Sequence, residues 1–231
     1  MKLLVVIPTH NEKENIGLII KEVFELAIDG MDVLVVDGES TDGTQAEVKN
    51  FQNNYGNLFL LEEKMEGLGK AYMAGFRFAI EKNYDYALQM DADFSHGPEY
   101  VKEFLKDIEE VDFVIGSRYR ADGRKKMSFL RNLVSQAGCL YAKTILGSRL
   151  NDITGGYNLW RIKVLRAMDF DNFVSGNFLF QVEIKYRAEK QGFKFKELPI
   201  IFKERLHGES KLTIPIILES FWKVFLIRWR K

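Results

Sequence analysis

Two aspartates stand one residue apart directly after an apolar run, in the segment Asp91-Ala92-Asp93. Alternate residues of an extended chain share a face, so both carboxylates can reach one hard cation. Mg²⁺ or Mn²⁺ held by few carboxylates takes its remaining ligands from water and substrate phosphates, which suits a nucleotide diphosphate. Two solvated turn aspartates before a helix start at Pro98 would give the same pattern. The pair is a candidate metal site for Mg²⁺ or Mn²⁺.

A second acidic turn begins at Asp37, which ends another apolar run. An acid in this position can accept hydrogen bonds from a base or from ribose hydroxyls, as acids after strands do in nucleotide-binding α/β folds. Ser40, Thr41 or Asp42 in the same turn can also cap the helix that follows. Both interpretations can hold together.

The segment Glu66–Ala71 opens a helical pattern with two glycines and Lys70. Its glycines would let the backbone approach a ligand while Lys70 supplies charge, although the spacing is not that of a Walker A loop. The three histidines, His10, His96 and His207, lie in polar turns whose spacing matches no zinc site. We expect them to make structural or substrate contacts.

The charges balance overall, with 33 basic and 33 acidic residues, which excludes a generally basic nucleic-acid binder. Basic residues are nevertheless concentrated between Arg118 and Arg131, a segment with six basic residues and one acidic residue, and again from Lys203 to Lys231. Cys139 is the single cysteine, so no internal disulfide can form and a cytosolic-facing protein is favoured.

Strand-length apolar runs alternate with helical patterns over the first half of the chain. This alternation predicts one α/β domain with a mainly parallel sheet flanked by helices, whose ligands bind at the carboxyl ends of the strands. The runs are Leu3–Ile7, Val33–Val36, Leu58–Leu61, Tyr86–Met90 and Phe113–Ile115, and the helical patterns are Ile16–Leu26, Thr44–Phe51, Leu68–Ile80 and Tyr100–Ile108.

The rhythm weakens after Arg118. We predict a basic loop there, followed by a helix over Phe129–Leu146, a turn over Asn151–Tyr157, a helix near Phe178–Gln191 and a strand near Lys196–Phe202.

The C-terminal segment Leu212–Lys231 is strongly apolar but is interrupted by Glu219 and Lys223. Its uninterrupted span is shorter than the roughly 20 residues that a membrane-spanning helix needs. With Trp222 and Trp229 near basic residues, it is typical of a helix that lies on a membrane surface. A helix packed on the domain or on a protein partner is the alternative.

Six motifs stand in order along the chain: Pro8-Thr9-His10-Asn11-Glu12 with Asn15; Val36-Asp37 followed by Ser40 and Asp42-Gly43-Thr44; Gly67-Leu68-Gly69; Met90-Asp91-Ala92-Asp93 with Ser95-His96; Gly116-Ser117-Arg118-Tyr119; and Gly208-Glu209-Ser210-Lys211. In this order they resemble the dolichyl-phosphate mannose synthases, which belong to the inverting family 2 glycosyltransferases. The resemblance covers nearly the whole chain. It implies a GT-A type nucleotide-diphospho-sugar transferase fold, a divalent cation, GDP-mannose as donor and a polyprenyl or dolichyl phosphate as acceptor.

The resemblance also implies roles for individual residues. Nucleotide binding falls to Pro8, Thr9, Asn11, Glu12, Asp37, Glu39, Gly67, Gly69, Lys70 and Ala92. Catalytic roles fall to Asp91, Asp93, Arg118 and Asp152, with Asp91, Asp93 and Ser95 at the metal. Acceptor phosphate binding falls to Arg118, Arg131, Ser135, Arg205 and Lys211.

Two positions depart from the family pattern. Gly38 stands where the family usually has a second aspartate, and Ser95 where it often has glutamine. Gly38 bears on base or ribose selection, and Ser95 on the metal shell.

The acceptor chemistry sets the expectation for Asp152. A phosphate monoester is mostly ionised at neutral pH, with a second pKa of ~6, so it needs no strong base to become a nucleophile. Arginines would then act by placing it. We therefore expect Asp152 to position the donor sugar or the arginine cluster rather than to act as an obligatory base.

The expected organisation is a catalytic domain over residues 1–211, with a nucleotide-binding half at 1–117 and an acceptor half at 118–211, followed by an amphipathic helix at 212–231. We expect peripheral association with the cytoplasmic side of a membrane, a small membrane-anchoring protein as a further partner, and no nucleic acid. Two alternatives stay open: the same fold using UDP-glucose or UDP-N-acetylglucosamine with a polyprenyl phosphate, and a non-catalytic module that binds nucleotide sugar or lipid phosphate.

Overall fold

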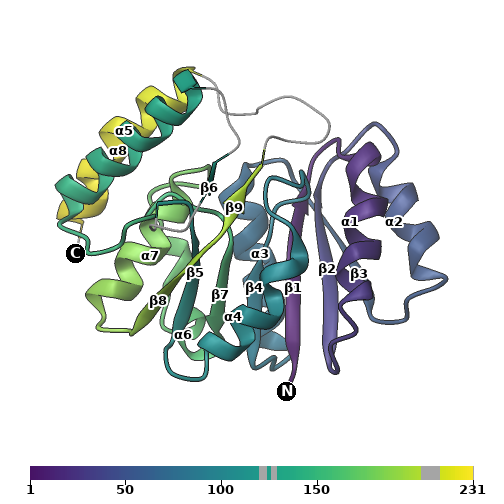
Figure 1. The fold of residues 1–231 in the computed structure, drawn as a ribbon. Coiled ribbons are helices and arrows are strands. Elements are labelled where there is room, and N and C mark those ends of the chain that lie inside the picture. Colours follow the sequence, from purple (N-terminus) through teal and green to yellow (C-terminus); the bar gives the residue numbers. More distant parts are fainter. Residues whose placement is uncertain (120–123, 126–128, 204–213, 231) are drawn as a thin grey trace.

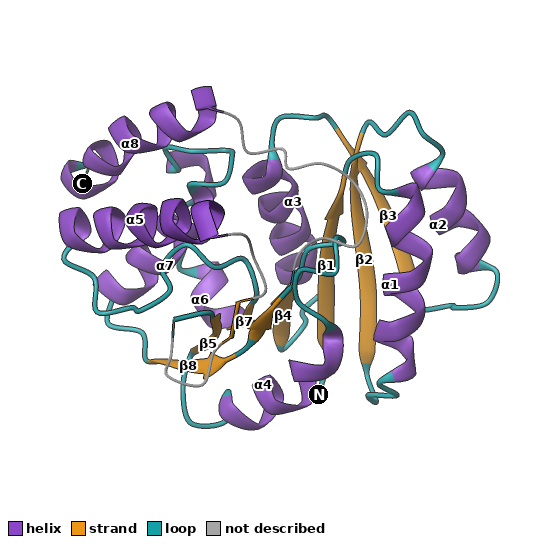
Figure 2. Cartoon of the chain, turned by 45° about the horizontal axis from the view of Figure 1, so that its top comes forward, coloured by secondary structure: helices purple, strands orange, loops and turns teal. Residues whose placement is uncertain are grey.

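A seven-stranded sheet in the order β3-β2-β1-β4-β7-β5-β8 forms the centre of the molecule, with helices packed against it (Figures 1 and 2). The structure is a computed structural model that describes residues 1–119, 124–125, 129–203 and 214–230. The strands of the sheet are β1 (Leu3–Thr9), β2 (Met31–Gly38), β3 (Leu58–Glu63), β4 (Tyr86–Gln89), β5 (Phe113–Ser117), β7 (Asn158–Arg161) and β8 (Phe195–Pro199), while β6 (Arg124–Lys125) pairs with β9 (Ile201–Phe202).

The strand β1 is apolar throughout because both of its faces are covered. Leu3, Val5 and Ile7 belong to the core on one face of the sheet, and Leu4 and Val6 to the core on the other. The first core includes residues of α1 (Lys13–Glu25), α2 (Thr44–Gln52) and α4 (Val101–Asp107), and the second includes residues of α3 (Leu68–Glu81), α5 (Phe129–Leu146), α6 (Ile162–Arg166), α7 (Phe180–Lys190) and α8 (Ile214–Trp229). The α/β class with a mostly parallel sheet and helices on both faces is confirmed.

One strand of the seven-stranded sheet was not predicted from the sequence, nor was the two-residue β6, which lies where a basic loop was expected. The four residues of β7 lie between β4 and β5 and run antiparallel to both, although the alternation of strands and helices would have made β4 and β5 direct neighbours. Because two antiparallel pairings restore the original direction, β5 again runs parallel to β4. A four-residue run with a polar residue at each end carries no clear strand pattern, but its buried Leu159 and Trp160 fill both cores.

The strand directions place the polar turns at one edge of the sheet. In the parallel pair β1–β2, Thr9 is opposite Asp37, and β4 and β5 end in the same direction. The turns that follow these four strands, which hold most residues singled out in the sequence, therefore lie along a common edge.

Two glycines provide a test of how closely α3 approaches the sheet. A Cβ added at Gly75 would lie 2.4 Å from Val6 Cγ1, whereas a Cβ added at Gly138 in α5 would meet nothing within 4 Å. We expect Gly75→Ala to lower the free energy of unfolding by about 1–3 kcal/mol through overpacking. Gly138→Ala should raise it by up to about 1 kcal/mol, because alanine favours the helix. Urea unfolding of both variants measures the difference, and equal effects would contradict this packing.

Candidate active site

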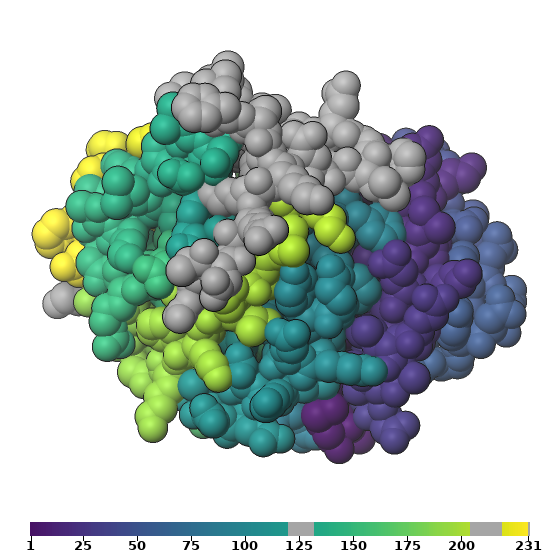
Figure 3. Space-filling model, in the orientation of Figure 1, coloured from purple at the N-terminus to yellow at the C-terminus, as the bar shows by residue number. Residues whose placement is uncertain are grey.

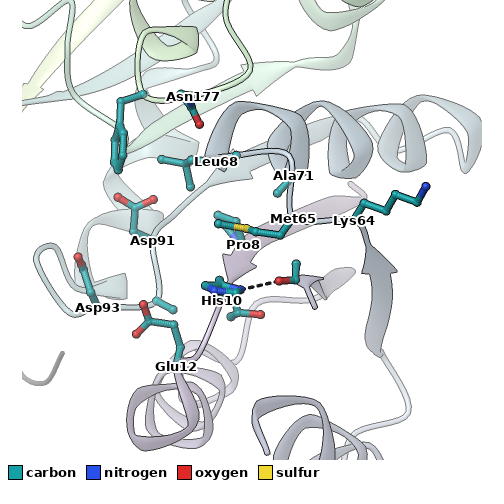
Figure 4. Close-up of a pocket in the computed structure, with 15 residues that line it drawn as sticks. Pro8, His10, Glu12, Lys64, Met65, Leu68, Ala71, Asp91, Asp93 and Asn177 are labelled. Atoms are coloured by element: carbon teal, nitrogen blue, oxygen red, sulfur yellow. Dashed lines mark hydrogen bonds between the residues drawn. The ribbon is translucent and has the colours of Figure 1, made fainter. Parts of the chain in front are cut away.

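A pocket opens at the carboxyl edge of β1, β2 and β4, and Figure 4 shows Asp91 and Lys64 at opposite ends of it, with Pro8, His10 and Met65 between them. It is lined by Pro8, Thr9, His10, Glu12, Gly38, Lys64, Met65, Gly67, Leu68, Ala71, Asp91, Ala92, Asp93, Asn177 and Phe178. The predicted nucleotide residues Pro8, Thr9, Glu12, Gly67 and Ala92 thus share one pocket with Asp91 and Asp93, two of the three predicted metal residues. The pocket lining does not include Asn11, Asp37, Glu39, Gly69, Lys70 or Ser95.

Asp37 organises the turn beside the pocket. It is fully buried, and its carboxylate accepts hydrogen bonds from the side chains of Thr9 (2.9 Å), Ser40 (2.5 Å) and Gln45 (2.7 Å), and from the backbone N–H of Ser40. Burial alone would raise the pKa of Asp37, but these hydrogen bonds lower it below its usual value. Contact of Asp37 with a nucleoside stays a prediction, and its described contacts make it the residue that holds the β1 and β2 turns together.

The neighbouring residues fasten the same two turns. His10 Nδ1 lies 2.6 Å from the carbonyl oxygen of Gly38, the N–H of Asn11 donates to Ser40 Oγ (2.8 Å), and Asn11 Oδ1 accepts from the N–H of Thr41 (2.9 Å). Asn11 has a φ of 55°, in the left-handed region that asparagine tolerates. Asn11 therefore contributes to the shape of the pocket without lining it.

Met65 forms the pocket wall next to Gly38, and Glu39 holds the backbone of Met65. The carboxylate of Glu39 accepts from the N–H of Met65 at 3.1 Å. A Cβ added at Gly38 would lie 3.0 Å from Met65 Sδ, so the thioether fills the space that a larger residue at this position would take. Met65 therefore occupies the space beside Gly38, the position at which this chain departs from the family pattern.

Asp91 and Asp93 occupy the other end of the pocket (Figure 4). Tyr72 on α3 donates a 2.6 Å hydrogen bond to Asp91 Oδ1, and the Asp91 side chain is 29% exposed. Asp93 Oδ1 accepts from the N–H of Ser95 at 3.0 Å. Burial, together with the nearby charge of Asp91 and its hydrogen bond, raises the pKa of Tyr72 well above its usual value, so this phenol stays a donor to Asp91.

The donor set at this end suits a divalent cation. Two carboxylates offer the oxygen ligands that Mg²⁺ and Mn²⁺ accept, and the open pocket leaves room for ligands from a substrate. Among the described residues, no group of three or more histidine, cysteine or acidic side chains is placed to hold an ion by itself. An ion here would take its remaining ligands from water and substrate oxygens. A metal contact of Ser95, which is buried and whose N–H bonds Asp93, stays a prediction.

The glycines at the start of α3 admit a neighbouring loop. Gly67 has a φ of 107°, and an added Cβ would lie 2.0 Å from Asn177 Oδ1; at Gly69 it would lie 2.5 Å from Phe180 Cβ. The N–H of Lys70 donates to the carbonyl of Gly176 at 3.0 Å. Close backbone approach was predicted toward a ligand, and the structure shows it toward the loop that carries Asn177 and Phe178.

That loop supplies pocket residues that the sequence analysis missed. Asn177 and Phe178 lie more than one hundred residues after the glycines they pack against, and no spacing or motif connects them. Lys64, Met65, Leu68 and Ala71 line the same wall and were also missed. Of these, Leu68 and Ala71 stood inside the segment Glu66–Ala71 that the sequence singled out, but neither was assigned a role.

Arg118 and Asp152, both predicted to be catalytic, form a buried ion pair. Arg118 Nε and Nη2 donate to the two carboxylate oxygens at 2.7 and 2.8 Å, and the N–H of Arg118 donates at 2.9 Å. Burial alone would raise the pKa of Asp152, but Arg118 lowers it to about 2. The carboxylate is therefore held ionised and engaged by Arg118, and its role as a positioning residue stays a prediction.

A buried lysine supports the same turn. Lys185 on α7 is fully buried and donates to the carbonyl oxygens of Asp152 and Gly155. A Cβ added at Gly156 would lie 3.2 Å from Asp91 Oδ2. The turn over residues 152–156 therefore connects the Arg118 ion pair to the carboxylate pair in the pocket.

The remaining predicted acceptor residues are only partly described. Ser135 on α5 is half-buried, and its Oγ lies 2.8 Å from the hydroxyl of Tyr119, beside Arg118. Arg131 belongs to α5, but its side chain is outside the described part of the chain, as are Arg205 and Lys211 altogether. The structure brings together Arg118 and Ser135.

Comparison with known proteins gives consistent matches. The family model for glycosyl transferase family 2 matches residues 4–169. An undecaprenyl-phosphate mannosyltransferase of Micrococcus luteus is 40% identical over 99% of this chain and 94% of its own length, and a polyprenol monophosphomannose synthase of Mycolicibacterium smegmatis is 36% identical over 96% of this chain and 85% of its own.

Solved structures show the same fold. Glucosyl-3-phosphoglycerate synthase from Mycobacterium tuberculosis, in complex with Mn²⁺, UDP-glucose and phosphoglyceric acid, superposes with a TM-score of 0.71 over 98% of this chain and 79% of its own, at 16% identity. The likeness confirms the predicted GT-A type fold. At this identity it carries no information about the substrate.

The buried lysine predicts an unusual dependence of stability on pH. Burial lowers the pKa of Lys185 to about 8 from an ordinary 10.5, so the unfolded chain binds more protons between these values. The free energy of unfolding should therefore rise with pH across this window, by roughly 3 kcal/mol relative to Lys185→Met. Urea unfolding at pH 7.5 and pH 10.5 measures this, with Lys21→Met on the exposed face of α1 as control. A difference between wild type and Lys185→Met that stays constant would contradict the prediction.

Proposed function

This chain belongs to glycosyl transferase family 2, and from that premise we propose that it transfers mannose from GDP-mannose to a polyprenyl phosphate with inversion at the anomeric carbon. It is a glycosyltransferase, and both bacterial relatives carry names that specify mannosyl transfer to a polyprenyl phosphate. The observation that carries the proposal is the placement of Asp91 and Asp93 in one pocket with Pro8 and Glu12, next to the turn that holds Arg118.

The donor would lie along the pocket. Its nucleoside would contact the wall made by Pro8, His10, Gly38 and Met65, and its diphosphate would reach the Asp91 end. A bound Mg²⁺ or Mn²⁺, held by Asp91 and Asp93, would stabilise the charge that develops on the departing diphosphate. Asn177 and Phe178, near the Asp91 end, would contact the sugar.

The reaction would be a single displacement. An oxygen of the acceptor phosphate forms a bond to the anomeric carbon as the bond from that carbon to the diphosphate oxygen breaks, and GDP leaves. Because the acceptor is already ionised at neutral pH, the chain has to orient it rather than remove a proton. Arg118 is suited to this because Asp152 fixes the orientation of its guanidinium by accepting hydrogen bonds from Nε and Nη2.

The donor base and sugar are the finer part of the proposal. Gly38 departs from the family pattern, and Met65 fills the space beside it, so base recognition here need not follow the family. UDP-glucose or UDP-N-acetylglucosamine as donor is therefore the second candidate. Both candidates use the same pocket and the same acceptor chemistry.

A membrane surface would present the acceptor. Large apolar side chains are exposed on α5 and α8, which pack side by side, with Tyr141 Oη donating to the carbonyl of Phe221 at 2.9 Å. Figure 3 shows α8, in yellow, beside α5 at the edge of the molecule. The exposed residues are Leu133, Val134, Leu140, Phe221, Trp222, Phe225, Leu226 and Trp229. We refer to them as the apolar face.

The apolar face combines the two alternatives left open for the C-terminal helix. Val224 and Ile227 are buried and belong to the core, while the residues on the other side of α8 face outward. No helix in the described part of the chain is both long and apolar enough to cross a bilayer. Peripheral association on the cytoplasmic side of a membrane, through both helices, is part of the proposal. A small membrane-anchoring partner protein stays a prediction. The division of the chain into a nucleotide-binding half that ends at residue 117 and an acceptor half that ends at residue 211 also stays a prediction.

Radiolabel transfer tests the donor. Label from GDP-mannose should enter a short polyprenyl phosphate in detergent with Mn²⁺ or Mg²⁺, while UDP-glucose and UDP-N-acetylglucosamine give none. Asp91→Ala should reduce the rate by at least roughly a hundredfold, because a charge-stabilising group is lost. The product's anomeric configuration, read by NMR, should be β. Transfer only from a UDP-sugar would overturn the mannose assignment, and an α-linked product would overturn inversion.

Liposome flotation tests the apolar face. Wild-type protein should float with vesicles, and the double variant Trp222→Ser/Trp229→Ser should bind at least roughly tenfold more weakly, because two large apolar groups no longer enter the interface. Leu18→Ser on α1, which removes an exposed apolar side chain elsewhere, is the matched control. Equal flotation of all three proteins would show that α8 does not contact lipid.

A further inference from the structure

The carboxylate of Asp91 has different surroundings on its two oxygens. Oδ1 accepts the hydrogen bond from Tyr72, which is fully buried. Oδ2 faces His96, whose Nε2 lies 3.7 Å away, and the backbone of Gly156, where an added Cβ would lie at 3.2 Å. A separation of 3.7 Å is too long for a hydrogen bond.

His96 is buried beside this oxygen without a hydrogen bond of its own. Its side chain is 2% exposed, and its ring stacks on that of Tyr157 at 4.4 Å with an angle of 4°. Tyr157 is fixed in turn by donating to the carbonyl of Gly97 at 3.1 Å. Within the described part of the chain, neither ring nitrogen of His96 has a hydrogen-bond partner. The stack therefore holds the imidazole in place next to Asp91 while both nitrogens remain unused.

Gln181 on α7 presents a second unused group. Trp160 Nε1 can only donate, so Gln89 Oε1, at 3.2 Å, is an acceptor and Gln89 Nε2 is a donor. That donor lies 2.5 Å from Gln181, which fixes Oε1 of Gln181 as the acceptor. The buried Nε2 of Gln181 thus points elsewhere and has no partner among the described residues, and rotating the amide would not provide one.

Gly156 packs against both Asp91 and the amino group of Gln181. The position of a Cβ at Gly156 lies 3.5 Å from Gln181 Nε2 and 3.2 Å from Asp91 Oδ2. A buried polar group without a partner is destabilising, and native proteins contain few of them. One such group beside Asp91 and a second beside Gly156, which packs on Asp91, indicate that their hydrogen bonds are made in another state of the site.

We propose that His96 and Gln181 are positioning residues that orient Asp91 when a nucleotide diphosphate and its divalent cation occupy the pocket. The inference rests on the proposed function and adds two residues to it. Carboxylates that bind metals are themselves held by hydrogen bonds from a surrounding shell, as Tyr72 holds Oδ1 of Asp91. A shift of the carboxylate by less than about 1 Å would bring Oδ2 within hydrogen-bond distance of His96.

The test is a double-mutant cycle read by calorimetry of GDP binding in the presence of Mn²⁺, with the full chain. His96→Phe keeps a ring to stack on Tyr157 but removes both nitrogens, and Gln181→Met keeps the length of the side chain but removes the amide. Each should weaken binding by roughly tenfold to a hundredfold. The KM for the donor should rise, while the KM for the polyprenyl phosphate stays unchanged. His96→Gln, which restores a donor near the position of Nε2, should recover part of the affinity.

Coupling to Asp91 distinguishes positioning from a general structural effect. In an Asp91→Asn background, His96→Phe and Gln181→Met should cause little further loss, since the group on which they act is already altered. Wild-type affinity in both single variants, or an undiminished loss in the Asp91→Asn background, would overturn the inference alone. If Asp91→Asn itself left the binding of GDP and UDP with Mn²⁺ unchanged, the proposed donor site would fall and the inference with it. Should His96→Phe not fold, His96→Gln and Gln181→Met complete the cycle.

Discussion

The buried carboxylate of Asp152 connects the two parts of the site. It accepts hydrogen bonds from both the guanidinium and the backbone N–H of Arg118, which follows the end of β5. Lys185 on α7 donates to carbonyl oxygens of the turn that contains Asp152. The turn then leads through Gly156, which packs against Asp91, into β7. The strands β4 and β5, which carry the carboxylate pair and Arg118 at their ends, are not direct neighbours in the sheet. The position of Arg118 relative to Asp91 and Asp93 therefore depends on this ionic arrangement.

Burying this ion pair has an unfavourable desolvation free energy, and its contribution to the site is to fix the orientation of Arg118. Removing two or three charged groups from water costs several kcal/mol for each ion before their attraction is counted, so a buried ion pair is weak support for stability by itself. What it provides is orientation, since a bidentate guanidinium–carboxylate pair fixes the plane of Arg118. The rings of Tyr119 and Phe202, at 5.3 and 5.2 Å from the guanidinium carbon, restrict it further. An arginine held in this way can orient a phosphate without paying the entropy of ordering a flexible side chain.

The pocket and the apolar face belong to different parts of the fold. The pocket is built at the ends of β1, β2 and β4, where parallel strands bring their turns together. The apolar face is built on α5 and α8, which join the core through Cys139, Ala142, Val224 and Ile227 and direct their other sides outward. Ser135 on α5 contacts Tyr119 next to Arg118. Through Tyr119, this contact connects α5 to the residue proposed to orient the acceptor.

The sequence by itself determined the alternation of strands and helices, the polar turns after β1, β2 and β4, and the Asp91–Asp93 pair, because burial periodicity and turn chemistry are local properties. The tertiary structure decided the antiparallel insertion of β7, the packing of Asn177 and Phe178 over the α3 glycines, and the full engagement of Asp37 by its own turn. The first two features depend on which distant segments pair and how closely they pack, and the third depends also on Thr9, which reaches Asp37 from β1. A four-residue strand, or two loops more than one hundred residues apart in the chain, leaves no period in the sequence, since the energy that fixes them is the burial they gain only once the sheet has formed.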